Sequence, residues 1–492
     1  MSRANVHLIE DEAVIAERER KQYVKMTQTP IARLIIGLGI PTTLSMMVTS
    51  LYNLADTYFV SLIGDDAITA AASNLLALMS IIQAIGFTFG MGSGSIISRL
   101  LGKRDRENAD KVFSSSLFIS CVSGLLILAF GFIFFTPMLR LLGSKSADVL
   151  GYSKQYARYI LIAAPFMCMS FVLNNVLRAE GKAVLSMIGL IVGALVNVAL
   201  DPILIFAADM GITGAAIATC VSQILSFLIL LFMFLSGKTV VRFRFRSISH
   251  HFKVYGDVIS TGFPSFCRQI LASLCTVFLN GAAFDCGVAH YGTEEGGKAA
   301  QAALGVVQKV FMLAFSMALG IGQGYQPVLG YNYSAKRFDR VKSAYLFTLA
   351  FSMCVMAAFA LVCGFCSSLV MQMFSLSPEA TEIGALALRL QCICMPLLPL
   401  NFMASITYQS VGSKAIASLL SVSRQGLFYI PAVLILPKTM GLIGVQSCQA
   451  ISDFLAFFFA IPFTIMFMRT VKRERERALN DQIEKETTST NE

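Results

Sequence analysis

Residues 53–60 read NLADTYFV and place one carboxylate, that of Asp56, near the end of the first long apolar segment, which opens with Gly39-Ile40-Pro41. A charged side chain near the centre of a bilayer costs at least about 2.5–3.5 kcal/mol, so an acid kept there marks an ion or proton site by default. An interfacial Asp that reaches the headgroups or caps a helix is the alternative. We favour the first interpretation and predict that Asp56 is the coupling carboxylate of a secondary transporter.

The composition around this segment is that of a membrane protein. Of the 492 residues, 56% are hydrophobic and only 14% are charged, whereas soluble domains usually carry about 25% charged residues. The net charge of +10 comes largely from bases in short links between apolar segments, so it is not a nucleic-acid signature. We therefore expect a multi-pass protein of the cell membrane, in contact with the lipid bilayer and with no nucleic-acid partner.

Twelve segments are long and apolar enough to cross a bilayer, since a span needs about 20 predominantly apolar residues. We expect an all-α polytopic membrane protein with twelve transmembrane helices. The predicted spans are residues 35–62, 67–92, 112–137, 155–177, 184–207, 212–236, 256–284, 299–323, 342–368, 381–410, 415–436 and 441–468.

The charges in the links predict the orientation of the chain. Links that follow the even-numbered spans are rich in Lys and Arg, for example around Arg104 and Arg244, and the other links are poorer in bases. Basic links lie on the cytoplasmic side by the positive-inside rule. Both termini are therefore expected in the cytoplasm, in agreement with an even number of spans.

The chain also repeats itself once. A Gly-x-Gly-(x7)-Gly pattern that begins at Gly92 returns at Gly320, and Asp110-Lys-Val returns as Asp339-Arg-Val, with further matches in the same order. The period covers six spans, which return the chain to its starting side. We therefore predict two six-helix lobes related by a pseudo-two-fold axis along the membrane normal, with sites near the midplane of a central cleft.

This repeat predicts five regions of the chain. They are a cytoplasmic N-terminal segment (1–34), an N-lobe with spans one to six (35–236), a cytoplasmic linker (237–255), a C-lobe with spans seven to twelve (256–468) and a cytoplasmic tail (469–492).

Asn197 and Asp201 in the fifth predicted span add a second polar group. They are four residues apart and so share a helix face. Pro202 removes a helical hydrogen bond and is expected to kink or loosen the helix. Thr219 in span six could add a hydroxyl. With Asp56, these residues predict a site for a proton or a hard cation such as Na⁺; a polar kink that only satisfies its own backbone is the alternative.

The second half lacks these acids and is more basic within its spans. Arg268, Arg389 and Arg424 are expected either to face the central cleft or to brace helices, and Asp453 is expected to pair with one of them. The residues expected in a substrate cavity are Tyr52, Asn280, Arg268 and Gln269.

Other motifs argue against an enzyme. Cys363 and Cys366 have CxxC spacing but lie within a span, where packing is the better explanation. We find no metal motif, no nucleophile–base spacing and no phosphate loop. We therefore expect no catalytic residues and no cofactor other than a coupling ion, H⁺ or Na⁺.

Several segments together resemble the multidrug and toxic compound extrusion (MATE) family, and in particular a bacterial branch that includes a staphylococcal multidrug exporter. The likeness covers nearly all of residues 30–468. The segments that carry it are NLADTYFV (53–60), RLLGK (99–103), LRAEGK (177–182), NVALDP (197–202) and GITGAAIAT (211–219).

The resemblance implies twelve helices in two lobes and export of cationic drugs or dyes by H⁺ or Na⁺ antiport. It also implies a cation pocket at Asp56, Asn197, Asp201 and Thr219, with Na⁺ possible at the first three. The acid that some members carry in spans seven and eight is not evident here. Small cationic or amphiphilic molecules are thus the expected partners, and a monomer is the expected state.

Two other functions are alternatives to a cation exporter. A lipid-linked oligosaccharide flippase of the same superfamily would need a strongly cationic cavity, which Arg268, Arg389 and Arg424 could supply, whereas Asn197 and Asp201 argue against it. A channel is the second alternative. Two repeats with few polar spans are more typical of a transporter with alternating access than of a channel.

Overall fold

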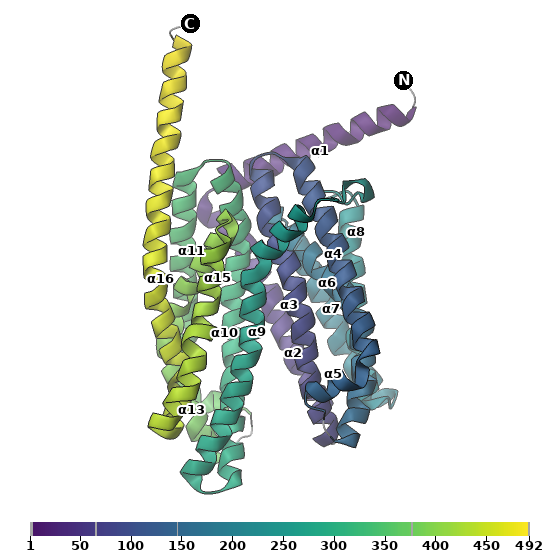
Figure 1. The fold of residues 1–492 in the computed structure, drawn as a ribbon, viewed down its shortest axis with the longest axis vertical. Helices are drawn as coiled ribbons and strands as arrows, with labels where there is room; N and C mark the ends of the chain where they lie inside the picture. Colours follow the sequence, from purple (N-terminus) through teal and green to yellow (C-terminus); the bar gives the residue numbers. More distant parts are fainter. Residues whose placement is uncertain (1–2, 64–65, 145, 375–376, 491–492) are drawn as a thin grey trace.

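The structure, a computed structural model, describes residues 3–63, 66–144, 146–374 and 377–490, and its regular elements in these ranges are all helical (Figure 1). The α-helices are α1 (Arg3–Gln28), α2 (Ile31–Ser61), α3 (Asp66–Gly102), α4 (Arg106–Ile133), α5 (Phe135–Leu141), α6 (Ala147–Ala179), α7 (Ala183–Pro202), α8 (Gly211–Leu235), α9 (Phe252–Tyr291), α10 (Glu294–Ser334), α11 (Phe338–Phe365), α12 (Ser367–Gln372), α13 (Pro378–Cys394), α14 (Leu398–Val411), α15 (Lys414–Val422) and α16 (Ile430–Thr490). Short 3-10 turns are η2 (Phe245–Ser247) and η3 (Met395–Leu397), and π-helical turns are η1 (Ile203–Ala207) and η4 (Ser423–Tyr429).

The expected all-α fold is confirmed. Eleven helical segments of the described chain are long and apolar enough to span a membrane. The last of them, 68 residues long, contains two spans, because its backbone turns at Gly441 (φ 59°). A Cβ on nearby Gly444 would lie 2.2 Å from the Leu436 carbonyl oxygen, so only glycine permits this tight turn.

Two helices continue past the predicted ends of their spans. The second and eighth spans were expected to end at residues 92 and 323, but α3 continues to Gly102 and α10 to Ser334. Hydropathy reports where the chain leaves the bilayer, whereas a helix ends only where its backbone hydrogen bonding ends. These two helices therefore extend beyond the apolar layer.

The two halves of the chain meet along two equivalent seams. In the following, the N-terminal half is residues 31–235 and the C-terminal half is residues 252–468. Helix α3 packs against α9, and α10 packs against α2. A Cβ on Gly92 would lie 2.1 Å from the Val258 carbonyl oxygen, and one on Gly320 would lie 2.3 Å from Thr43 Cα. The repeated glycines thus permit close backbone approach at matching places, as the sequence repeat leads one to expect.

Each half also repeats one internal hydrogen bond. Asn174 Nδ2 donates to the Ser186 carbonyl at 3.1 Å, and Ser405 Oγ donates to the Ala417 carbonyl at 3.0 Å. Both bonds join residues twelve positions apart, across the turns into α7 and α15. The duplication seen in the sequence is therefore also present in the packing.

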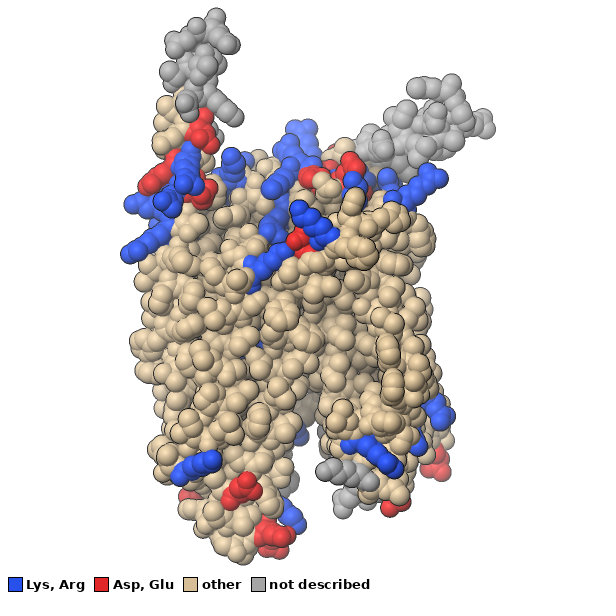
Figure 2. All heavy atoms as spheres, viewed as in Figure 1, with Lys and Arg blue, Asp and Glu red and all other residues tan. Residues whose placement is uncertain are grey.

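Charge and shape distinguish the two ends of the molecule. Both termini lie at one end, and Lys and Arg gather there (Figures 1 and 2). The space-filling view is hollowed between the two halves at the opposite end (Figure 2). The closed seams therefore lie toward the basic end, and the cleft opens away from it.

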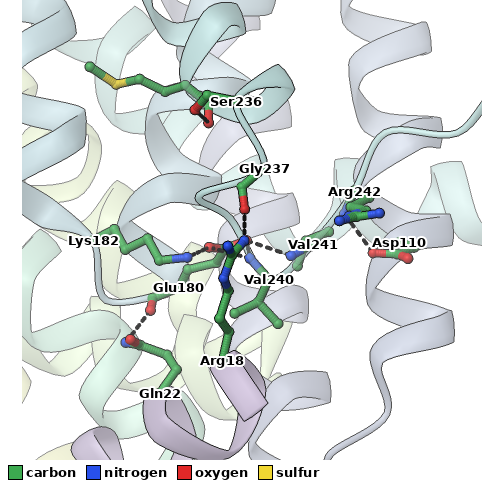
Figure 3. Close-up of polar contacts among 11 residues, drawn as sticks. Arg18, Gln22, Asp110, Glu180, Lys182, Ser236, Gly237, Val240, Val241 and Arg242 are labelled. Atoms are coloured by element: carbon green, nitrogen blue, oxygen red, sulfur yellow. Dashed lines mark hydrogen bonds and ion pairs between the residues drawn. The ribbon is translucent and has the colours of Figure 1, made fainter. Parts of the chain in front are cut away.

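The segment that links the halves is bound to the N-terminal half by two acids (Figure 3). Glu180, whose side chain is fully buried, accepts from the backbone N–H groups of Val240 at 3.0 Å and Val241 at 2.7 Å. Asp110 accepts from the Arg242 N–H at 2.8 Å. Because these bonds use backbone donors, they fix the path of the linker independently of its side chains.

Helix α1 contacts both halves at the basic end. From this helix, Arg18 donates to the Gly237 carbonyl and Gln22 to the Glu180 carbonyl (Figure 3). On the other side, Asn332 Nδ2 of α10 donates to the Met26 carbonyl at 3.0 Å. The N-terminal segment is thus a helix that bridges the linker and the C-terminal half.

Candidate functional site

Three neighbouring helices of the N-terminal half each present two polar side chains one helical turn apart. The pairs are Tyr52 and Asp56 on α2, Asn197 and Asp201 on α7, and Thr219 and Gln223 on α8. Residues four apart share a helix face, and α2, α7 and α8 contact one another. The sequence-predicted residues Asp56, Asn197, Asp201 and Thr219 therefore lie in one region, which we call the acidic chamber.

Tyr156 on α6 joins the members of this chamber. Its hydroxyl donates to Asp56 Oδ2 at 3.4 Å, and α6 packs against α8, the helix that carries Thr219. Asn197 Nδ2 donates to Thr219 Oγ1 at 3.4 Å. Asp56 on α2 and Asp201 on α7 lie on two helices that pack against each other. The two carboxylates thus share one small polar volume inside an apolar half.

Most oxygens of the acidic chamber are buried without a donor. Asp201 is 0% exposed and Asp56 is 9% exposed. Among the described residues, neither oxygen of Asp201 has a hydrogen-bond partner, nor do Asp56 Oδ1 and Asn197 Oδ1. A buried carboxylate without a partner is strongly unfavourable. These oxygens could therefore coordinate a small cation, and either a cation or a proton would neutralise their negative charge.

The backbone next to Asp201 is irregular, as Pro202 predicts. Proline has no N–H to offer the carbonyl four residues earlier, and a π-helical turn, η1, follows at once. The Ala208 N–H donates to the Ile203 carbonyl five residues back, at 2.8 Å. A π turn within a helix often marks a functional site, and here it begins two residues after the candidate carboxylate of Asp201.

The structure also shows where the other predicted residues lie. The Tyr52 hydroxyl accepts from Gln223 Nε2 at 3.4 Å, which places Tyr52 at the acidic chamber. No hydrogen bond or ion pair of the described residues connects Arg268, Gln269 or Asn280, all half-buried on α9, to this chamber. Their place in a substrate cavity stays a prediction.

Sequence reasoning missed Tyr156 and Gln223. Gln223 lies four residues after Thr219, so the spacing that paired Asn197 with Asp201 could have found it. Tyr156 has no such signal, because a tyrosine in an apolar span is ordinary.

The arginines of the C-terminal half form an ion pair and a hydrogen bond between helices. Arg424 Nε donates to Asp453 Oδ1 at 2.7 Å, so Asp453 pairs with one of the arginines as expected. Arg389 Nε donates to Ser367 Oγ at 2.7 Å and so braces α13 against α12. In the described part of the chain, no group of three or more His, Cys, Asp or Glu side chains could hold a metal ion. Na⁺ at the acidic chamber would therefore depend on two carboxylates, an amide and hydroxyls.

Comparison with known proteins agrees with this architecture. The family model described as MatE matches residues 41–203 and 270–435, which is more than half of the chain. The chain therefore belongs to the MatE family and is a multi-pass membrane protein. The first matched segment contains Asp56, Asn197 and Asp201.

Two groups of relatives are similar over most of their length. The multidrug export protein MepA of Staphylococcus aureus strain MSSA476 is 25% identical over 439 residues, which are 88% of this chain and 94% of that protein. MepA of Staphylococcus haemolyticus strain JCSC1435 is 25% identical over 444 residues, or 90% and 95% of the two chains.

Solved structures share the fold. A multidrug resistance MATE family transporter of the MOP superfamily, in an outward-facing conformation, superposes with a TM-score of 0.85 at 26% identity, over 92% of this chain and 98% of that one. A MOP superfamily transporter from Pyrococcus furiosus, whose binding pocket is described as having reverse polarity, gives a TM-score of 0.84 at 26% identity, over 92% and 99%. The chain thus has the fold of these solved transporters.

Proposed function

We propose that the protein exports organic cations by antiport with H⁺ or Na⁺, and that the acidic chamber binds the coupling ion. The observation that carries this proposal is the pair of buried acids, Asp56 and Asp201, with three carboxylate oxygens lacking any donor among the described residues. A chamber with this much unpaired negative charge is stabilised when a cation occupies it and destabilised when the cation leaves. Occupancy can therefore bias the conformation of the lobe.

The irregular turn after Asp201 offers a way to couple ion binding to helix packing. The π turn η1 lies directly after Pro202, where one helical hydrogen bond is already missing. A segment with fewer fixed backbone bonds can change its path at lower cost than a regular helix. Neutralising Asp201 changes the electrostatic force on this turn, so α7 and α8 can shift against α2.

The cleft in Figure 2 supports alternating access. It opens at the end away from the basic residues, and the positive-inside rule assigns that end to the cell exterior. Both termini then lie in the cytoplasm of a cell-membrane protein. Binding of H⁺ or Na⁺ from outside would release the exported cation, after which the halves rock and the site faces inward.

The experiment uses the purified chain in lipid vesicles loaded with ethidium. A proton gradient and a sodium gradient are imposed separately, and the loss of dye fluorescence is followed. We expect one of the two gradients to accelerate efflux and the collapse of that gradient to abolish the acceleration. Dye movement that depends on neither gradient would show that the protein is not a coupled antiporter.

A lipid-linked oligosaccharide flippase remains a second candidate because Arg268 and Arg424 both lie inside the C-terminal half. Asp453 neutralises one of the two charges, however, whereas a pyrophosphate carries at least two negative charges. Deletion of the gene separates the two functions. A cell-wall defect without any change in dye resistance would favour the flippase.

A further inference from the structure

The interior of the C-terminal half contains an incompletely neutralised cluster of arginines. Asp453 Oδ1 accepts from Arg424 Nε at 2.7 Å and from Gln449 Nε2 at 3.1 Å. Arg268 lies on α9, which packs against η4, the turn that carries Arg424. Two positive charges thus face one negative charge, which is the opposite polarity to the acidic chamber.

Aromatic rings connect the two arginines. Arg268 Cζ lies 5.2 Å from the centroid of the Phe402 ring, and Arg424 Cζ lies 5.6 Å from that of Phe315. The two rings contact each other edge to face, with centroids 5.5 Å apart. Cation–π contacts offset part of the desolvation of the arginines, but they bring no negative charge. The rings therefore leave the excess positive charge in place.

One buried donor atom of the cluster, Arg424 Nη2, has no acceptor among the described residues. The Arg424 side chain is 8% exposed. Arg268 Nη2 donates to Ser265 Oγ at 3.3 Å, and Arg268 forms no ion pair in the described part of the chain. A guanidinium group carries five N–H donors. A bound anion would accept hydrogen bonds from the free donors and would neutralise the one excess positive charge.

We propose that this cluster, formed by Arg268, Arg424, Phe315 and Phe402, is a binding site for one monovalent carboxylate carried on an aromatic body. The planar donor fork of arginine matches a carboxylate, which it can bind through two parallel hydrogen bonds. The single excess charge selects a monoanion, and the rings favour a flat apolar body. Half-buried Arg268 would receive the ligand and buried Arg424 would complete its coordination.

Equilibrium dialysis of radiolabelled benzoate against the purified full-length chain in lipid nanodiscs tests this site without any ion gradient. The native protein should bind about one benzoate per chain in a saturable manner. Arg268→Gln should weaken binding about tenfold or more, because a charge-assisted bond is lost. Arg268→Lys, which keeps the charge but not the fork, should fall between the two. The matched control is Arg389→Gln, which removes an arginine that only braces α13, and it should bind as the native chain does.

Three results would overturn the proposal. One is the absence of saturable benzoate binding to the native chain. A second is unchanged binding by Arg268→Gln, or by Arg268→Lys should the first variant fail to give a monodisperse protein. The third is displacement of benzoate by chloride at equal concentration, since that would reveal a site for small inorganic ions only. Because binding is measured at equilibrium, its failure would leave the proposed antiport untouched.

Discussion

At the scale of single residues, the chemistry of the acidic chamber depends on oxygens that lack partners. Sequence alone identifies Asp56, Asn197, Asp201 and Thr219, because a polar residue inside an apolar span is conspicuous. It does not identify Tyr156, which reaches Asp56 only because the fold brings α6 beside the helices of the acidic chamber. Contacts between helices that are distant in sequence have no local signal, so such residues emerge only from the fold.

Asn197→Ala tests the contribution of the free amide oxygen. Removing this oxygen takes away one ligand of the coupling ion, so binding should lose about 1–3 kcal/mol. The ion concentration that gives half-maximal dye efflux should rise roughly 5- to 150-fold, while efflux at saturating ion persists. The measurement is an ion titration of ethidium efflux from vesicles.

The matched control is Asn401→Ala. Asn401 is also buried, and its Nδ2 donates to Ser423 Oγ at 3.1 Å, across the same 22-residue spacing as the bond from Asn197 to Thr219. If both variants shift the ion dependence equally, the amide of Asn197 has only a structural role.

At the scale of elements, hydropathy predicts which segments cross the membrane. It does not predict where their helices end or how the flanking segments fold. The twelve spans appear as helices, yet α3 and α10 pass beyond the apolar layer. The charged residues before the first span form α1, which is too polar to be detected as a span. The path of the linker also escapes sequence reasoning, because backbone N–H groups at residues 240–242 make its contacts with Glu180 and Asp110.

Glu180→Ala should destabilise the protein strongly. It would leave Lys182, whose Nζ lies 2.5 Å from Glu180 Oε2, without its ion-pair partner, and two buried N–H groups without an acceptor. Breaking a buried charge pair typically costs about 3–5 kcal/mol. We expect a matching loss in the free energy of unfolding, measured by denaturation in detergent.

Glu107→Ala is the comparison for this change. Glu107 is 82% exposed and pairs with Lys111 at the helix surface, so its loss should cost at most about 1 kcal/mol. Similar losses for the two variants would show that the linker contacts contribute little to stability.

At the scale of the whole molecule, the duplicated seams define two bodies that meet at the basic end and separate at the other (Figure 2). The sequence repeat predicts this pseudo-symmetry, because equivalent glycines allow equivalent close contacts. Which end is open cannot be derived from the repeat, because a two-fold axis along the membrane normal relates one half to the other and does not distinguish the two ends. The open end is a property of the state that the structure represents.

A cross-link between the halves should stop transport. The hydroxyls of Ser50 on α2 and Ser316 on α10 are in hydrogen-bond contact across the seam. In a background without the twelve native cysteines, a disulfide from S50C and S316C should abolish dye efflux, and a reductant should restore it. The control is S144C with S153C, whose hydroxyls lie 2.7 Å apart within the N-terminal half. Efflux that persists through the oxidised seam would argue against relative motion of the halves.

Ion-driven ethidium efflux by Asp56→Asn and Asp201→Asn in reconstituted vesicles tests whether the acidic chamber binds the coupling ion. Asparagine keeps the size of each side chain but removes the charge that a coupling ion neutralises. Both variants should insert normally and lose gradient-driven efflux, whereas Asp285→Asn, which alters an exposed acid of α9, should transport like the native chain. Native efflux by either chamber variant, at the native ion dependence, would show that its carboxylate does not take part in ion coupling.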